Sequence, residues 1–169
     1  VNNKMAEEQK TVNLVASDGE SFEVALDTAM LSNLIKIMAD GGDGDLDDVP
    51  LPNVNADILT KVIAFMTEYK REKMNEIAKP LVSENMSQVV QTWYADFVTG
   101  LEQDTLFELI LAANFMDIKP LLDLTCATVA SMIKGKTPED IRKHFNIVND
   151  FTPEEEATVR EENKWCEEE

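Results

Sequence analysis

The sequence is poor in basic side chains. It carries 15 lysines and arginines against 33 aspartates and glutamates, which gives a formal net charge of -18 at pH 7. Because nucleic-acid phosphates and anionic membrane surfaces repel such a charge, we expect neither a nucleic acid nor a membrane as a partner. The charge is compatible with a basic protein partner, although an acidic surface commonly serves solubility alone.

Long apolar runs and cysteines are also scarce. No apolar run approaches the ~20 residues that cross a bilayer, and residues 1–10 lack the apolar core of a signal peptide. The two cysteines, Cys126 and Cys166, lie far apart in the sequence, which indicates neither a metal-ligand pair nor a disulfide framework. We therefore expect a protein of the cytoplasm and the nucleus.

The chain offers few candidates for catalysis. The glycines within residues 40–48 lie among aspartates that would repel a phosphate, and this loop lacks the closing glutamate of an EF-hand. His144, the only histidine, has no nucleophile beside it, and Cys126 lies on an apolar helix face, where a buried thiol is the default interpretation. We predict no catalytic residue, no metal site and no cofactor.

Alternating apolar residues predict a small sheet near the N-terminus. Residues 12–16 and 22–26 alternate on either side of a tight turn that contains Gly19, which indicates a hairpin. Residues 49–52, VPLP, form a short extended segment whose prolines exclude a central strand. The acidic, glycine-rich residues 40–48 before it are predicted to be an exposed, mobile loop.

Helical spacing of apolar residues predicts that most of the remaining chain is helical. One helix is expected to begin at Asp27 or Thr28 and to extend to Met38, and a second follows a cap at Asn55. The pattern decays between residues 67 and 91, which we interpret as an insertion that is partly helical at best.

The second half of the chain is predicted to contain helices alone. The first of these helices begins near Asp104, and its apolar face is expected to carry Leu106, Phe107, Leu109, Ile110 and Ala113. Pro120 fits the first turn of the next helix, which Gly135 ends. Threonine-proline pairs at 137–138 and 152–153 each provide a helix cap followed by a proline at the first helical position. The whole pattern is that of an α+β, mostly helical fold.

The last segment of the chain sets apolar residues among many glutamates. Its larger apolar residues are too few for an independent core: Phe145, Ile147, Phe151, Val159 and Trp165. Either this tail packs back on the domain through these residues, or Trp165 anchors a partner, since tryptophan is enriched at binding hot spots. Composition alone leaves the two interpretations open.

A resemblance to one family extends over most of the chain. Residues 106–169, which begin LFELILAANF and end NKWCEEE, closely resemble the S-phase-kinase-associated protein 1 family, the adaptors of SCF-type ubiquitin ligases. The earlier stretches SDGESFEV and VPLPNVNADIL match the same family in the expected order. The resemblance covers about Val12 to the C-terminus, apart from a variable insertion at 70–91.

This resemblance implies a domain organisation. Residues 1–10 are expected to be a disordered N-terminus. Residues 11–133 are expected to form a BTB/POZ-type domain with a small three-stranded sheet, and this domain includes the acidic loop 40–48 and the insertion 70–91. Residues 134–169 are expected to be C-terminal helices that bind F-box proteins.

The resemblance also implies a function. Members of this family link a cullin scaffold to an F-box protein, which brings the substrate for ubiquitin-dependent degradation, and they have no active site of their own. We therefore expect a non-catalytic adaptor of an SCF-type E3 ubiquitin ligase. The alternative is an elongin-C-like or other BTB-type assembly protein, although elongin-C-like chains stop before the segment from KTPED to NKWCEE that is present here.

The matching motifs imply individual site residues. The family's AANY stretch contacts the cullin, which implies Asn114 and Phe115 here, where phenylalanine replaces the usual tyrosine and its hydroxyl. The positions implied for F-box binding are Phe107, Leu122, Cys126, Val129, Phe145, Ile147 and Trp165. The proline of KTPED, here Pro138, is hydroxylated and then glycosylated in some protist members. Without an F-box partner, an exposed apolar groove is expected to favour a homodimer.

Overall fold

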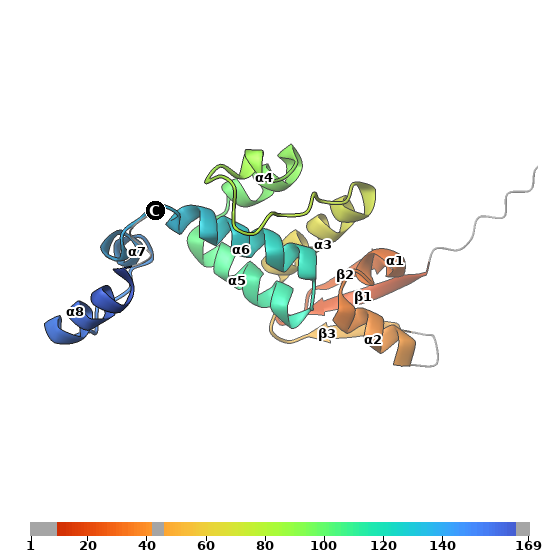
Figure 1. Cartoon of the computed structure of the whole chain (residues 1–169). Coiled ribbons are helices and arrows are strands. Elements are labelled where there is room, and N and C mark those ends of the chain that lie inside the picture. The colour runs from red at the N-terminus through yellow and green to blue at the C-terminus, as the bar shows by residue number, and fades with distance from the viewer. Residues whose placement is uncertain (1–9, 42–45, 165–169) are drawn as a thin grey trace, which may run out of the picture. The chain divides into compact units, whose positions relative to one another are not determined.

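The computed structural model describes residues 10–41 and 46–164, and these contain a small three-stranded sheet and eight α-helices, two of which lie between the second and third strands in the chain (Figure 1). The chain divides into two compact units, Val1–Met132 and Ile133–Glu169. The first contains β1 (Thr11–Ala16), β2 (Ser21–Ala25), α1 (Leu26–Ala29), α2 (Asn33–Gly41), β3 (Asp48–Leu51), α3 (Ala56–Arg71), the 3₁₀ turn η1 (Met86–Gln88), α4 (Thr92–Thr99), α5 (Gln103–Phe115) and nearly all of α6 (Lys119–Ile133). The predicted α+β, mostly helical class is confirmed.

The sheet has β1 at its centre, antiparallel to β2 and parallel to β3. The predicted hairpin is confirmed: Gly19 has a φ of 88° in the turn, and its N–H donates to the carbonyl of Ala16 at 3.0 Å. Val12 and Leu14 of β1 are buried, as their alternation predicts. Pro50 lies in β3 at the edge of the sheet, where the N–H that proline lacks is not needed for a ladder.

The prediction of one continuous helix from Asp27 or Thr28 to Met38 is wrong, because two helices, α1 and α2, occupy this stretch. The reason is Ser32, which is fully buried between them. Its hydroxyl donates to the carbonyl of Met116 and accepts the N–H of Ile35 at 3.3 Å, so it starts a new helix. A side chain that bonds to backbone in this way competes with helix continuation.

The ends of the acidic segment at 40–48 also differ from the expected loop. α2 runs through Gly41 and β3 begins at Asp48, so regular structure enters both ends. Residues 42–45, which hold most of its glycines, lie outside the described residues, as do residues 1–9 and the candidate Trp165.

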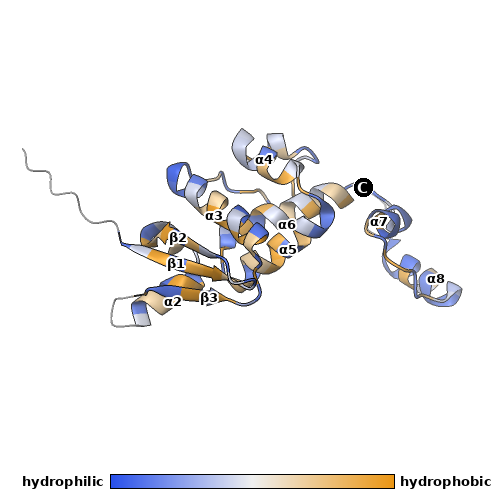
Figure 2. Ribbon diagram, turned by 180° about the vertical axis from the view of Figure 1, so that it is seen from behind, coloured by the Kyte–Doolittle hydropathy of each residue, from blue (hydrophilic) through white to orange (hydrophobic). Residues whose placement is uncertain are grey.

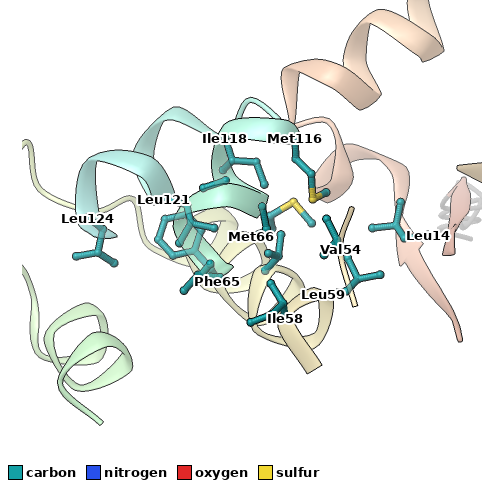
Figure 3. Packing of buried hydrophobic residues seen from close by; sticks show 14 of the residues in the cluster. Leu14, Val54, Ile58, Leu59, Phe65, Met66, Met116, Ile118, Leu121 and Leu124 are labelled. Carbon is teal, nitrogen blue, oxygen red and sulfur yellow. The ribbon is translucent and has the colours of Figure 1, made fainter. Parts of the chain in front are cut away.

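α3 supplies one side of the main core. The predicted cap at Asn55 is confirmed, since its side-chain oxygen accepts the N–H of Ile58 at 2.9 Å. The apolar side of α3 is buried through Ile58, Leu59, Val62, Phe65 and Met66. In Figure 3, Phe65 and Met66 point toward Ile118 and Leu121 of the α6 region.

The segment after α3 is mostly non-helical but is attached to the core. α3 continues to Arg71, and among the residues that follow, up to 91, only η1 is helical. The side-chain amide of Gln91 donates to the carbonyl of Lys73 at 2.8 Å, and its oxygen accepts the N–H of Asn75 at 2.9 Å. Ile77 and Met86 are buried in the core cluster. The segment therefore contributes to the core rather than leaving it.

Tyr94 of α4 fixes the start of this segment. Its side chain is 1% exposed and its hydroxyl donates to the carbonyl of Glu72. The ring packs edge-on against Phe65, with 5.7 Å between the ring centroids. Burial, followed by the negative charge of Glu68, raises the pKa of Tyr94 to about 12.

We predict that Tyr94→Phe lowers the free energy of unfolding at neutral pH by about 1 kcal/mol, because one hydrogen bond is lost. In the native protein, stability should fall as the pH rises from 10 toward 12, because the unfolded chain ionises its tyrosine first. Tyr94→Phe should remove part of that fall. Urea unfolding between pH 7 and 11 measures both effects, with Tyr69→Phe as the control. An identical alkaline loss in Tyr94→Phe and wild type would contradict the assignment.

Candidate partner-binding surfaces

α5 has one face in solvent, and it carries apolar residues. The exposed positions recur at the spacing of one helix face: Asp104, Phe107, Glu108, Leu111 and Asn114. Phe107, which we expected on the buried face, is 38% exposed, so that expectation is wrong. Leu111 is 66% exposed and was not predicted as a site residue. The core contacts are made by the opposite side, with Leu106, Leu109, Ala112 and Ala113 buried.

Asn114 and Phe115 lie together at the C-terminal end of α5. Asn114 is exposed, whereas Phe115 is half-buried and packs on the core. The chain reverses there through Asp117, whose φ of 51° lies in the left-handed region and whose N–H donates to the carbonyl of Asn114 at 3.2 Å. α5 and α6 consequently lie side by side (Figures 1 and 2).

The start of α2 is hydrogen-bonded to the turn between α5 and α6. The N–H of Asn33 donates to the carbonyl of Asp117 at 3.1 Å, and its side-chain amide donates to the Asp117 carboxylate at 2.8 Å. Ile37, four residues further along α2 and on the same face as Asn33, is 64% exposed. Sequence reasoning missed Ile37, although it falls outside the spacing of the buried residues of that helix.

Leu122, Cys126 and Val129 occupy one face of α6. Their spacing of four and three residues aligns them along the helix. Leu122 packs partly on the core, Val129 is half-buried and Cys126 is exposed. The buried thiol taken as the default for Cys126 is therefore wrong. α6 is apolar on most sides, with Leu121, Leu124, Thr125, Ala127 and Thr128 buried, so spacing could not select its core face.

The smaller unit contains α7 (Pro138–His144) and α8 (Pro153–Glu162), which are mostly hydrophilic (Figure 2). The predicted helix starts are confirmed: Thr137 accepts the N–H of Asp140, and Thr152 forms a reciprocal capping box with Glu155.

The apolar side chains of this unit are largely in solvent. Phe145 is half-buried and Ile147 is 54% exposed. Val148, Phe151 and Val159 are exposed as well, and were not predicted as site residues. Trp165, the remaining candidate, lies outside the described residues.

Pro138 occupies the first position of α7 and is exposed. Hydroxylation and glycosylation of this residue stay a prediction.

The described residues contain few groups suited to other chemistry. Across 10–41 and 46–164, no three histidine, cysteine, aspartate or glutamate side chains are placed to hold a metal ion. His144 lies edge-on to the ring of Phe145, with 4.8 Å between the centroids. In the same part of the chain, every helix is too short or too polar to cross a bilayer.

Comparison with known proteins identifies the family. The chain is 50% identical over 157 residues to the S-phase kinase-associated protein 1 homolog of Tetrahymena thermophila, covering 93% of this chain and 94% of that protein. The chain belongs to the Skp1 family. SKP1-like proteins 11 and 12 of Arabidopsis thaliana are 51% and 50% identical to it over 157 residues, which cover 93% of this chain and 97% of each relative.

Two models of the Skp1 family match separate parts of the chain. The tetramerisation domain matches residues 10–71, which span the sheet and the helices α1 to α3. This is the POZ domain of the family, so the predicted BTB/POZ-type fold is confirmed. The dimerisation domain matches residues 119–166, which span α6, α7 and α8.

We predict that Cys126 reacts with a thiol reagent in the native protein at a rate within about tenfold of the unfolded chain, because its side chain is exposed. The measurement uses a Cys166→Ser variant, in which only Cys126 remains. As a control, Ala113→Cys in a chain without the two natural cysteines should react only on unfolding, since Ala113 is fully buried. Equal protection of the two thiols would show that Cys126 is not accessible.

Proposed function

We propose that this Skp1-family protein is a non-catalytic adaptor of an SCF-type ubiquitin ligase, and that it bridges a cullin to F-box proteins in the cytoplasm and nucleus. The observation that carries the proposal is the exposure of apolar side chains along α5, α6 and the smaller unit of a chain whose net charge is -18. Contiguous exposed apolar residues mark interaction surfaces in soluble proteins.

The cullin site that we propose is the end of α5. Asn114 offers an exposed amide and Phe115 a partly exposed ring, and the hydrogen bonds from Asn33 to Asp117 hold α2 against this turn. Leu111 and Ile37, both about two-thirds exposed, would extend the site with apolar contact area. Because Phe115 has no hydroxyl, the cullin complex would lack one hydrogen bond, worth about 1 kcal/mol, that a tyrosine at this position would make.

We propose F-box contacts in each of the two units. The larger unit contributes Phe107 of α5 and the α6 face of Leu122, Cys126 and Val129, and the smaller unit contributes Phe145, Ile147 and Trp165. A partner helix that lays an apolar face on the α6 residues would use them as anchors. The surrounding glutamates would attract basic residues at the rim and raise the association rate more than the affinity.

Self-association belongs to the same proposal. The family model over residues 119–166 is described as a dimerisation domain, and those residues include most of the proposed F-box contacts. We therefore propose a homodimer when no F-box protein is present. The alternative of an elongin-C-like assembly protein gives no role to α7 and α8.

The proposal is tested by mixing the full chain with a purified F-box protein and with a cullin N-terminal domain. Co-elution of the chain with each partner, and of all three together, is the expected result. Absence of both binary complexes, with every component shown to be folded by circular dichroism, would rule out the adaptor function.

We predict that Asn114→Asp raises the Kd for the cullin about tenfold, because it places an unpaired charge in the interface, while F-box affinity is unchanged. Calorimetric titration measures both affinities. Asn75→Asp is the matched control, since it makes the same chemical change on an exposed residue of another segment. Cullin affinity that is equal in the two variants would remove Asn114 from the cullin site.

We also predict that truncation after Asp150, which removes α8, lowers F-box affinity at least about 30-fold and leaves cullin affinity within about twofold. Truncation after Lys164 removes Trp165 but retains α8, so the two chains separate the contributions of the helix and the terminal tryptophan. Equal losses of cullin and F-box binding would show that the two surfaces are assigned wrongly.

A further inference from the structure

The described residues of the smaller unit form no apolar core. None of its described residues, 133–164, is fully buried, and α7 and α8 bury no side chain. Apolar burial is ordinarily the dominant stabilising term for packed helices. Since that term is small here, polar contacts have to determine how α7 and α8 are arranged within the unit.

Arg142 of α7 makes the most enclosed of these polar contacts. Its guanidinium Nη1 lies 3.2 Å from the Glu156 carboxylate of α8, and the two side chains are 20% and 27% exposed. In the part of the chain that the structure describes, every other ion pair has at least one partner that is more than half exposed. Exposed pairs contribute little to stability, so this pair has the largest expected effect.

The same guanidinium lies over the ring of Phe151, with 6.0 Å from its carbon to the ring centroid. This is the geometry of a cation–π contact, which favours arginine over lysine because the guanidinium is planar. Phe151 is 45% exposed, so one of its faces contacts Arg142 while much of the ring stays available to a partner.

The backbone of Arg142 positions a second exposed apolar residue. α7 ends in a Schellman motif, in which Asn146 adopts a φ of 53° and the N–H of Ile147 donates to the carbonyl of Arg142 at 2.8 Å. Ile147 is a proposed F-box contact that is 54% exposed. Arg142 thus contacts Phe151 through its side chain and Ile147 through its main chain.

Neighbouring charges extend the contact into a chain of ion pairs. Glu156 also lies 3.6 Å from Arg160, and Arg160 pairs with Glu139 at the start of α7. A hydrogen bond from the backbone, followed by the charge of Arg160, holds the pKa of Glu139 below its usual range. The four residues Arg142, Glu156, Arg160 and Glu139 therefore connect α7 and α8 at both ends of α7.

We propose that Arg142 is a positioning residue for F-box binding: by pairing with Glu156 it fixes α8 and Phe151 against α7 before the partner arrives. This inference rests on the proposed function. Ordering that is present in the free protein does not have to be achieved on binding, so it raises affinity without a contact of its own.

The first test uses the free protein. In Arg142→Gln, amide hydrogen exchange in α8, such as that of Glu156 and Asn163, should be about fivefold faster than in wild type. Lys143→Gln is the matched control, since it removes the same charge from the next residue, whose side chain is exposed. Exchange that is equal in the two variants would overturn the proposal, because Arg142 would then not order α8.

The second test is a double-mutant cycle on F-box affinity, with Arg142→Gln, Glu156→Gln and both together. Each single change should raise the Kd about fivefold to tenfold, and the double change should be no worse than the stronger single one. Lys143→Gln should leave F-box affinity unchanged. Cullin affinity should be unchanged in every variant of the cycle. Additive losses would overturn the proposal, since they would mean that each side chain contacts the partner independently.

Failure of this inference is distinguishable from failure of the proposed function. If wild type binds no F-box protein, the adaptor function fails, whereas the hydrogen-exchange comparison still decides whether Arg142 orders α8. If wild type binds and the cycle is additive, the function stands and the positioning role of Arg142 is rejected.

Discussion

The buried hydroxyl of Ser32 makes the contact on which the proposed cullin-binding end of the larger unit depends. It joins α2 to the α5–α6 turn across 84 positions of sequence, by donating to the carbonyl of Met116 while it accepts the N–H of Ile35. The hydrogen bonds of Asn33 to Asp117 reinforce this junction from the surface. Because a buried polar group that loses its partner costs more than an ordinary hydrogen bond contributes, the junction fixes the position of the turn that follows Asn114.

The two units are stabilised by different physical terms. The larger unit buries a continuous apolar cluster that extends from the sheet through α3 to α6, and within the described residues every buried side-chain nitrogen and oxygen has a hydrogen-bond partner. The smaller unit combines helix caps, a Schellman motif and ion pairs, which salt screens and which are individually weak. Because the smaller unit leaves most of its described apolar residues in solvent, few of them are buried to stabilise its fold.

Features that depend on neighbours in the sequence could be predicted. The caps at Asn55, Thr137 and Thr152 each involve a side chain and an amide three residues later, so a short motif contains both partners. The hairpin and the edge position of β3 follow in the same way, from a glycine turn and from a proline.

Features that depend on distant partners could not be predicted. The break at Ser32 requires Met116, and nothing near Ser32 in the sequence indicates that partner. The exposure of Phe107 and Cys126 was missed because α5 and α6 are apolar on most sides, and periodicity selects a core face only when the other faces are polar. The family resemblance, rather than periodicity, identified these two residues as candidate contacts.

The hydrogen bonds at the two ends of the segment after α3 have a consequence for its length. Gln91 bonds to Lys73 and Asn75, and Tyr94 bonds to Glu72, so the ends of the intervening chain are held together independently of the number of residues between them. The entropy of closing a flexible loop grows slowly, by about 0.6 kcal/mol for each doubling of its length. Exposed residues between these anchors, away from the buried Ile77 and Met86, can therefore be gained or lost at small cost in stability, without displacing α3 or α4.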